Sequence, residues 1–315
     1  MLNFQNNFPL NQITTLQIGG PARQFVTATT QDELIESIGL ASQQNIPHLL
    51  IGGGSNLLVA DEGVNKLVIK NEVEGITKVV RFLTVKSGTP LQHLVDFSIA
   101  NNLSGLQNLS GIPGTLGGAV FGNAGAYGQS ISDYLREVVC FHPSAPLGTS
   151  RIVTLQKDEC EFDYRDSIFK RNKLAILEIV FKLDVGKSKD LRKEADEILE
   201  KRLVKYPKGI KCPGSFFKNF IAEKLPKEIL KKIPKEKIVY GKLPAGSLLE
   251  MVGAQGDKLG DIEIASYHAN LFMNKGNGKA SDFYALAKKY VQKVKTKFGI
   301  ILEPEVQLIN LPPLV

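Results

Sequence analysis

The sequence predicts an α+β fold divided into two or three domains. The chain has 315 residues, more than one ordinary domain needs. Amphipathic helices and short apolar runs follow one another along most of it, without an internal repeat. The composition changes after a charged helix that ends near residue 205, which marks a domain boundary. A hydrophobic content of 43% and a charged content of 23% are typical of a globular protein.

The first part of the chain begins with a helix that starts at a capping box. Thr30 and Glu33 stand three residues apart, in the order in which each side chain can cap the other's backbone N–H. A second helix is expected to have Thr89 as its cap and Pro90 at its first position, and to run to Asn101. Apolar runs predict strands at residues 47–51, 57–59, 67–69, 138–141, 152–155 and 174–183.

The second part of the chain follows an amphipathic helix at residues 190–202, and we place the domain boundary at residues 205–207. Residues 223–242 are rich in lysine and are interpreted as a solvated surface helix and loop. Ser281 is expected to cap a last helix that Gly299 closes. Residues 300–309 are expected to form a strand, in which Glu303 and Glu305 share one face because side chains alternate with a period of two.

Charge and cysteine usage narrow the functional classes. Three widely spaced cysteines (Cys140, Cys160, Cys212) without a CxxC pair suit a reducing cytoplasm, and the first residues do not look like a secretory signal. Four scattered histidines give no metal-ligand spacing, so no metal is expected. The net charge of +7 serves solubility or attracts polyanionic small molecules such as dinucleotides and UDP-sugars. Nucleic acid is disfavoured, because no basic stripe is interleaved with aromatic residues and the chain has no tryptophan.

Two glycine-rich stretches are the strongest candidates for a ligand site. Residues 52–56, Gly-Gly-Gly-Ser-Asn, follow a predicted strand directly, and such a turn can present backbone N–H groups to a phosphate or simply reverse the chain. Residues 111–128 contain seven glycines, more than a structural turn needs. Two such loops suit a pyrophosphate held from both sides. They do not suit the Rossmann dinucleotide fold, because no GxGxxG opens a helix after the first strand.

Three other segments contain candidate catalytic or binding residues, but none of them alone indicates a function. Residues 164–167 hold an Arg–Asp pair, which is usually a structural ion pair. Residues 214–219, Gly-Ser-Phe-Phe-Lys-Asn, put a hydroxyl, a cation and an amide together, but they also fit a turn into a strand. The carboxylates of Glu303 and Glu305 are as consistent with a solvent-facing position as with a functional one.

Together these segments resemble the UDP-N-acetylenolpyruvoylglucosamine reductases (the MurB family), in the family's order and over nearly the whole chain. Residues 15–22 resemble the family's N-terminal flavin-domain signature, and the two glycine-rich stretches resemble its FAD loops. Three further segments resemble those that hold its active-site arginine, its proton-donating serine and its catalytic glutamate: residues 162–170, 214–219 and 302–306. Residues 244–246, 260–261 and 268–270 also match family positions.

The resemblance implies a role for individual residues. The catalytic groups fall on Arg165, Ser215 and Glu305. Substrate contacts are expected from Tyr164, Arg202, Lys205, Lys218 and Asn219. FAD contacts are expected from Gly52, Gly53, Gly54, Ser55, Asn56, Leu57, Gly111, Ile112, Pro113, Gly114, Thr115, Gly117, Gly118, Ala119, Gly122 and Asn123.

The fold that the resemblance implies is a two-subdomain FAD-binding module of the vanillyl-alcohol-oxidase (PCMH) type, followed by a smaller α+β substrate domain. The module would cover residues 1–205, with subdomains of about 1–70 and 71–205, and the substrate domain residues 206–315. Phe220 stands where the family usually has proline, and Gln307 where arginine is common. Arg165 and Ser215 are 50 residues apart, which resembles the family's shorter form, without a tyrosine-bearing loop insertion.

The function that the resemblance implies is NADPH-dependent reduction of the enolpyruvyl group of UDP-N-acetylglucosamine enolpyruvate to UDP-N-acetylmuramate, in cytoplasmic synthesis of peptidoglycan precursors. FAD would be a non-covalent cofactor and NADPH a co-substrate. Arg165 would stabilise charge on the substrate carboxylate, Glu305 would donate a hydrogen bond or orient Arg165, and Ser215 would protonate C2. The UDP-sugar and NADPH are the expected partners, with neither nucleic acid nor a membrane, and a monomer is the expected state.

Three alternatives remain open from the sequence. The first is another FAD-dependent oxidoreductase of the same flavin-domain class, such as a sugar or hydroxy-acid oxidase, which would be expected to lack the segments of Ser215 and Glu305. The second is a non-catalytic nucleotide-binding protein that keeps the glycine-rich loops. The third is a basic protein that binds single-stranded nucleic acid, with strongly salt-dependent affinity.

Overall fold

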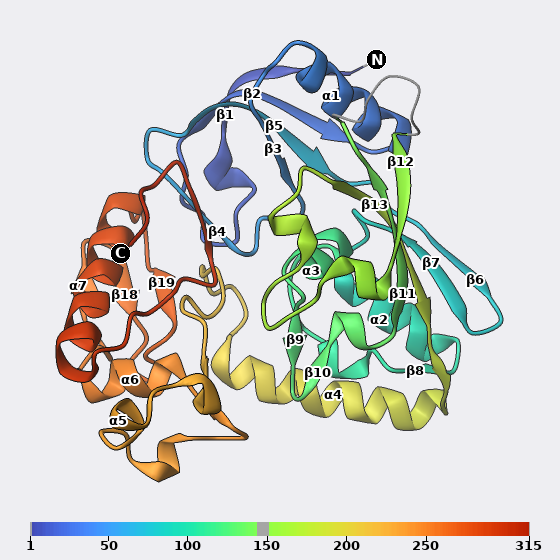
Figure 1. Ribbon diagram of the computed structural model, residues 1–315. Coiled ribbons are helices and arrows are strands. Elements are labelled where there is room, and N and C mark those ends of the chain that lie inside the picture. The colour runs from blue at the N-terminus through green and yellow to red at the C-terminus, as the bar shows by residue number, and fades with distance from the viewer. Residues whose placement is uncertain (1, 144–150, 315) are drawn as a thin grey trace. The chain divides into compact units, whose positions relative to one another are not determined.

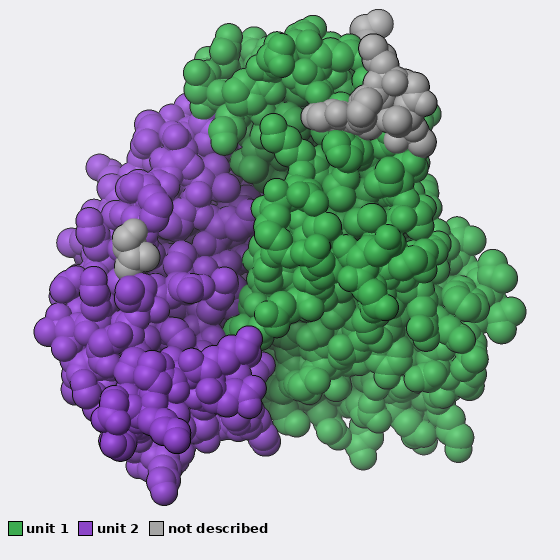
Figure 2. Space-filling view, viewed as in Figure 1, with its two compact units in different colours: residues 1–8, 22–53, 65–206 green, residues 9–21, 54–64, 207–315 purple. Residues whose placement is uncertain are grey.

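The computed structural model describes residues 2–143 and 151–314 (Figure 1). By its internal contacts the chain divides into two compact units, which Figure 2 colours separately. Unit 1 consists of residues 1–8, 22–53 and 65–206, and unit 2 of residues 9–21, 54–64 and 207–315. Two segments from the first 64 residues therefore belong to unit 2, and neither unit is one continuous stretch. The assignment of FAD binding to residues 1–205 and of substrate binding to residues 206–315 stays a prediction.

The first layer of unit 1 is a four-stranded sheet with helix α1 packed against it. The strand order is β1-β2-β5-β3, and β3 and β5 run parallel. Helix α1 begins at the predicted capping box, where Glu33 N donates to Thr30 Oγ1 and Thr30 N donates to Glu33 Oε2, both at 3.2 Å. Val26, Ile38 and Ile69 meet in the core between helix and sheet. The bounds are β1 (Gln5–Pro9), β2 (Pro21–Ala28), α1 (Gln31–Gln43), β3 (His48–Ile51) and β5 (Val64–Asn71).

The second layer of unit 1 is a five-stranded antiparallel sheet in the order β12-β11-β13-β7-β6. Its core is closed by helices α2, α3 and α4, which contribute side chains such as Leu94, Val120 and Leu191. The bounds are β6 (Ile76–Val79), β7 (Phe82–Lys86), α2 (Leu91–Ala100), β8 (Leu103–Ser104), α3 (Leu116–Phe121), β9 (Gly125–Ala126), β10 (Gln129–Ser130), β11 (Leu135–Phe141), β12 (Ile152–Gln156), β13 (Ala175–Lys182), β14 (Asp184–Val185) and α4 (Ser188–Lys205).

Unit 2 is built around a cluster of aromatic rings beneath its long helix. Phe216, Phe217, Phe272 and Phe283 lie with neighbouring ring centroids 4.7 to 6.1 Å apart, the range in which aromatic pairs attract. The bounds are β4 (Leu57–Val59), β15 (Phe220–Ile221), α5 (Lys227–Leu230), β16 (Lys242–Leu243), α6 (Ala245–Met251), β17 (Lys258–Leu259), β18 (Ile262–Ile264), β19 (Phe272–Asn274), α7 (Ala280–Phe298) and β20 (Gln307–Ile309).

Two predicted helix caps are wrong. The cap of α2 is Pro90, without a side-chain cap bond, and the hydroxyl of Thr89 instead accepts a hydrogen bond from Gly75 N at 3.1 Å. Ser281 lies inside the first turn of α7, whose cap position is Lys279. The predicted end of α7 is confirmed, since Gly299 adopts a left-handed φ of 75° and closes the helix.

The predicted strand over residues 300–309 is also wrong in its first part. Only β20, Gln307–Ile309, is a strand, and it runs parallel to β4. Glu303 and Glu305 do not share the face of a strand. Pro304 between them forms an isolated antiparallel bridge with Phe217, so tertiary contacts rather than a regular ladder set their positions.

Helix α7 receives its N-terminal cap from a residue far away in the sequence. Asp61 Oδ1 accepts from Ala280 N at 2.7 Å, and Asp61 Oδ2 accepts from Ser281 N at 3.0 Å. Partial burial alone would raise the pKa of Asp61, but these hydrogen bonds outweigh it and hold the pKa below its ordinary value. Asp61 therefore ties the segment 54–64 to the C-terminal part of unit 2.

We expect Asp61→Ala to lower the free energy of unfolding by about 1 kcal/mol, as for the loss of other N-terminal caps. Because the pKa of Asp61 is lower in the folded protein, its contribution is present above the unfolded pKa and is lost as the pH falls through the folded pKa. Urea unfolding at neutral and at acidic pH measures this. The deficit of Asp61→Ala should shrink in acid, and Glu62→Ala, a neighbouring exposed carboxylate, should show little deficit at either pH. An unchanged deficit at both pH values would contradict the capping role.

Within residues 2–143 and 151–314, none of the helices combines the length and the apolar character that a bilayer span requires.

Candidate active site

The two glycine-rich loops meet in unit 1, as their interpretation as one phosphate site requires. A Cβ on Gly52 would lie 2.1 Å from Thr115 Oγ1, and a Cβ on Gly53 would lie 2.7 Å from the Cα of Gly114. No side chain fits at such distances, so the sequence needs glycine there to bring the two backbones together. Gly114 also adopts a φ of 105°, which other residues rarely reach.

Gly118 has a different environment from the glycines at the loop contact. It is exposed in the first turn of α3, and a Cβ there would meet nothing nearer than Thr115 Oγ1 at 3.7 Å. The protein itself therefore has room for a side chain at Gly118. A substitution at this position tests a ligand contact without disturbing the fold.

We expect Gly118→Val to lower the affinity for FAD by about tenfold or more, the equivalent of ~1.4 kcal/mol or more, because the side chain would occupy the space left for the ligand. The control is Gly39→Val in α1, a buried position where a Cβ also meets no atom within 4 Å, so this variant carries the cost of a β-branched residue in a helix without touching the loops. Flavin content after dialysis and melting temperature are the measurements. Full flavin occupancy in Gly118→Val, or equal loss in both variants, would remove Gly118 from the site.

Arg165 is held in unit 1 in a strained backbone conformation. Asp163 and Asp166 exchange two backbone hydrogen bonds of 3.1 Å, and Arg165 in the turn between them has a left-handed φ of 56°. Its guanidinium donates to Gly125 O at 2.8 Å and, more weakly, to Asn123 O at 3.5 Å. A non-glycine residue in this conformation costs about 1–2 kcal/mol, and such strain concentrates at functional sites.

Arg202 is a second cation near Arg165. Its guanidinium carbon lies 5.4 Å from the ring centre of Tyr206, and the side chain packs against Gly111, which would place a Cβ 3.2 Å from Nε. Burial lowers the pKa of Arg202, and the positive charge of Arg165 lowers it further, although Tyr206 and Tyr127 act in the opposite direction. Arg202 Nε is buried without a hydrogen-bond partner in the described part of the chain.

Asn123 carries a second buried polar atom without a partner among the described residues, its Oδ1. Its Nδ2 donates to Asp163 O at 2.9 Å, and so ties the second glycine-rich loop to the turn that holds Arg165. Unsatisfied buried groups are rare in proteins and are expected where a ligand supplies the missing partner. The residues of unit 1 therefore fit a phosphate-bearing ligand beside the two loops.

Ser215 lies in unit 2 at the start of a firmly anchored segment. Gly214 precedes it with a φ of 87°, and Phe216 and Phe217 follow it, 0% and 1% exposed. Buried Asn270 holds this segment with two side-chain hydrogen bonds to one residue, because its Oδ1 accepts from Phe217 N and its Nδ2 donates to Phe217 O, each at 2.8 Å. The aromatic anchors fix where the serine stands.

The structure brings the segment of Glu305 directly against the segment of Ser215. Glu305 N donates to Phe216 O at 2.7 Å, and Lys218 N donates to Glu303 O at 2.9 Å. On the other side, Asn56 Nδ2 donates to Glu305 O at 3.1 Å. Ser215 and Glu305, two predicted catalytic residues that are far apart in the sequence, thus lie on adjacent backbone segments of one unit.

Several other predicted contact residues also make structural contacts. Lys218 Nζ lies 3.3 Å from Glu303 Oε2, and Asn219 Oδ1 accepts from Ala245 N, the first residue of α6, at 3.1 Å. Leu57 is 7% exposed in β4. A Cβ on Gly54 would lie 1.9 Å from Ile13 O, so this glycine is required for packing inside unit 2. Their contacts with FAD or substrate stay predictions.

All three cysteines, Cys140, Cys160 and Cys212, are buried. Burial raises the pKa of the Cys140 and Cys160 thiols to about 12, which keeps both protonated and unreactive at neutral pH. No group of three or more His, Cys, Asp or Glu side chains within residues 2–143 and 151–314 could hold a metal ion.

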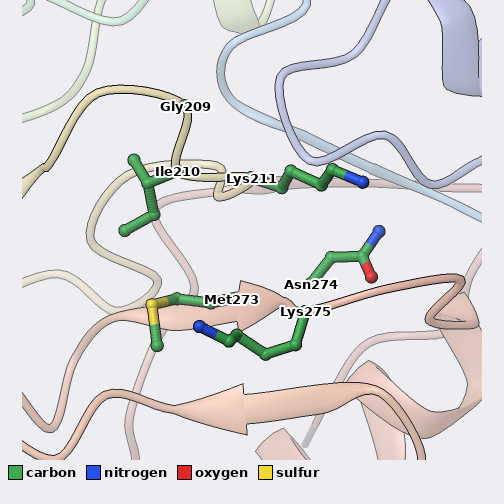
Figure 3. Close-up of a pocket in the computed structure, with 6 residues that line it drawn as sticks. All are labelled: Gly209, Ile210, Lys211, Met273, Asn274 and Lys275. Carbon is green, nitrogen blue, oxygen red and sulfur yellow. The ribbon is translucent and has the colours of Figure 1, made fainter.

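Unit 2 also has a pocket with a volume of about 190 Å³ (Figure 3). One of its lining residues, Lys211, stands four residues before Ser215 in the sequence. Its charged lining residues are Lys211 and Lys275, but their side chains run in opposite directions in Figure 3 and do not converge on one point. The side chain of Asn274 is already satisfied, because it donates to Leu16 O at 3.1 Å and accepts from Gly276 N and Gly278 N. The pocket lacks the convergent polar groups of a ligand site.

The sequence reasoning missed two parts of this arrangement. Asn270 was matched only as a family position, although it holds the serine segment. The left-handed backbone of Arg165 was not expected, and no local signal such as Asn or Gly announces it.

Comparison with known proteins connects both units to one group of enzymes. A model for the UDP-N-acetylenolpyruvoylglucosamine reductase C-terminal domain matches residues 206–309, and a model for an FAD binding domain matches residues 22–144. The UDP-N-acetylenolpyruvoylglucosamine reductase of Solibacter usitatus is 39% identical over 305 residues, which are 96% of this chain and 95% of that protein. Reductase 2 of Bacillus cereus is 33% identical over 302 residues, which are 96% of this chain and 91% of that protein.

A solved structure agrees with these relatives in fold. The UDP-N-acetylenolpyruvylglucosamine reductase from Thermus caldophilus superposes with a TM-score of 0.75 at 29% identity, over 98% of this chain and 99% of that one. The predicted α+β fold class with an FAD-binding module is confirmed. The identity of 39% over almost the full length of both proteins shows that this chain belongs to the UDP-N-acetylenolpyruvoylglucosamine reductase family.

Proposed function

We propose that this protein reduces the enolpyruvyl group of UDP-N-acetylglucosamine enolpyruvate to give UDP-N-acetylmuramate, with FAD as cofactor and NADPH as the source of electrons. The observation that carries the proposal is the pairing of two segments in unit 2, where Glu305 N donates to Phe216 O at 2.7 Å and so places Glu305 beside the Ser215 segment. An oxidase of the same flavin-domain class has no need for this pair. Membership of the reductase family supports the same reaction.

FAD is assigned to the two glycine-rich loops. Gly52, Gly53 and Gly114 allow the backbones to approach, and Gly118 leaves room for a ligand. Asn123 Oδ1 is a buried acceptor that a ribose hydroxyl or a ligand N–H would satisfy, and Arg202 Nε is a buried donor that a phosphate or substrate oxygen would satisfy. When bound, the flavin supplies the hydride chemistry between NADPH and the enolpyruvyl carbon.

Arg165 is assigned to the negative charge that collects on the substrate carboxylate when the double bond is reduced. A guanidinium is permanently charged and presents its donors in a planar fork that matches a carboxylate. Its bonds to the carbonyls of Gly125 and Asn123 hold the fork in place before substrate arrives. A donor that is already oriented stabilises the charge without a cost of reorganisation during the reaction.

Ser215 is assigned to the proton that C2 of the enolpyruvyl group needs. A serine hydroxyl is a weak acid, but an enolate-like carbon is a strong base. The buried rings of Phe216 and Phe217 hold the adjacent backbone firmly, so the hydroxyl can be presented with little loss of entropy. Glu305 is assigned a hydrogen bond to the enolpyruvyl group of the substrate. Tyr164, Arg202, Lys205, Lys218 and Asn219 are assigned to the carboxylate, the diphosphate or NADPH.

The purified protein tests this function directly. Acid precipitation should release free FAD. NADPH alone should reduce the bound flavin once, and consumption beyond that one equivalent should require the enolpyruvyl substrate, with one UDP-N-acetylmuramate formed for each further NADPH. Sustained oxygen consumption would instead identify an oxidase, and a colourless protein would identify a nucleotide-binding protein without flavin chemistry. We assign the reaction to cytoplasmic synthesis of peptidoglycan precursors by a monomer.

A further inference from the structure

The residues 223–242, which we call the lysine-rich segment, form an ordered surface of unit 2. Ile233 is 4% exposed in the core, and Leu225 and Ile229 pack against the same core. Pro226 and Pro234 stand at the caps of α5 and of a following 3-10 turn. These anchors hold the backbone, so the charged side chains between them face solvent from a defined surface rather than from a flexible tail.

The lysine-rich segment carries a charge excess that the protein does not neutralise. It holds seven lysines and three glutamates. Lys231 pairs with Glu228, and Lys237 pairs with Glu250. The exposed side chains of Lys227, Lys232 and Lys235 have neither an ion pair nor a hydrogen bond within residues 2–143 and 151–314. The remaining positive charge is therefore open to an external partner.

A tight turn at the end of the lysine-rich segment presents an aromatic ring to solvent. Val239 and Lys242 exchange backbone hydrogen bonds of 2.8 and 3.0 Å, and the two residues between them, Tyr240 and Gly241, have φ values of 49° and 71°. This geometry is that of a type I′ turn, which normally takes Asn or Gly at its first central position. Tyr240 is 99% exposed, so the turn gains nothing from burying its ring, and the neighbouring Val239 is 47% exposed.

We propose that the lysine-rich segment is a docking surface for an anionic lipid bilayer, with Tyr240 at the level of the headgroups. Tyrosine suits a membrane interface, since it has an apolar ring and a polar hydroxyl. The exposed lysines of the same segment would respond to the negative surface potential of acidic lipids. The contact is peripheral and needs no spanning helix. It replaces both the interpretation of this segment as a merely solvated surface and the expectation that the protein has no membrane partner.

The composition favours a lipid surface over an acidic protein. Protein interfaces are enriched in arginine and depleted in lysine, because the guanidinium fork forms directed pairs with carboxylates. Residues 207–315 contain eighteen lysines and no arginine. Lysine is a strongly hydrated point charge, which suits a diffuse layer of lipid headgroups that demands no shape complementarity.

The test is co-sedimentation of the full-length FAD-loaded protein with vesicles of phosphatidylglycerol and phosphatidylcholine in equal parts, and with vesicles of phosphatidylcholine alone. We expect binding only to the anionic vesicles, with a steep loss as salt shortens the range of the surface potential. The triple variant Lys227→Gln, Lys232→Gln, Lys235→Gln should partition about a hundredfold more weakly. Tyr240→Asn, which suits the same turn, should also bind more weakly and keep the fold.

The matched control removes the same charge from another surface of unit 2. Lys288, Lys293 and Lys295 lie on the exposed side of α7. The triple variant Lys288→Gln, Lys293→Gln, Lys295→Gln should keep wild-type partitioning. Equal weakening in both triple variants would show only a general effect of net charge and overturn the proposal. So would an absence of binding to anionic vesicles, or equal binding to neutral ones. Saturable binding of polyglutamate without vesicle binding would assign the surface to an acidic protein instead. None of these outcomes depends on the enzyme reaction, which is measured separately.

Discussion

Replacement of Ser215 by alanine is expected to leave the reduction of the flavin by NADPH nearly unchanged and to block its reoxidation by the enolpyruvyl substrate. The expected loss in the second step is about 10²–10⁴-fold, the usual effect of removing a general acid. Stopped-flow absorbance of the flavin separates the two steps. Ser215→Cys should retain more activity than Ser215→Ala, because a thiol can still donate a proton.

The control for this variant is Ser247→Ala in helix α6 of the same unit, which should be near wild type in both steps. A serine that only shapes the turn after Gly214 would instead cost some stability and slow both steps equally. If Ser215→Ala reoxidises at the wild-type rate, the proton comes from another group. Cys212 is then the nearest candidate along the chain, and Cys212→Ala tests it by the same measurement.

Replacement of Arg165 by lysine is expected to slow turnover by about 10²–10³-fold although the charge is kept, as for the loss of an oriented donor in an active site. Lysine cannot bond the carbonyls of Gly125 and Asn123 and also present two parallel donors to a carboxylate. The loss should appear in reoxidation by substrate and in substrate binding. Arg171→Lys is the matched control, since Arg171 pairs with Asp166 and Glu161 at the exposed end of the same segment and should tolerate lysine. Near-normal turnover in Arg165→Lys would make Arg165 a structural residue.

Features that depend on neighbouring residues could be predicted from the sequence. The capping box of Thr30 and Glu33 is local, and it formed as predicted. The glycine density of residues 111–128 predicted a loop that contacts phosphate, which stays a prediction, and the structure uses Gly53 and Gly114 for a close approach of the two loops to each other. In both cases the residue type alone restricts the conformation, so no distant contact is needed to decide it.

Features that depend on distant residues could not be predicted in the same way. Ser281 looked like the cap of α7, but Asp61 performs this role from 219 residues away. Glu303 and Glu305 looked like a strand face, but the bridge between Pro304 and Phe217 sets their backbone. Residues 9–21 and 54–64 precede most of unit 1 in the chain and yet belong to unit 2. Tertiary contacts override local propensity in each case.

Phe220 and Gln307, the two departures from the family pattern, both take part in β-pairing through their backbones. Phe220 is paired with Leu243 in a short antiparallel ladder, where it has the N–H that proline would lack. Gln307 begins β20, and its N–H donates to Asn56 O at 3.0 Å, a bond that does not depend on its side chain.

The most direct test of the proposed reaction is the visible spectrum of the purified protein through one anaerobic cycle. The proposed reaction predicts a yellow protein whose flavin absorbance is lost on addition of NADPH and returns on addition of UDP-N-acetylglucosamine enolpyruvate, with UDP-N-acetylmuramate as the product. A flavin that NADPH bleaches but that only oxygen restores, with the enolpyruvyl substrate left unchanged, would contradict it.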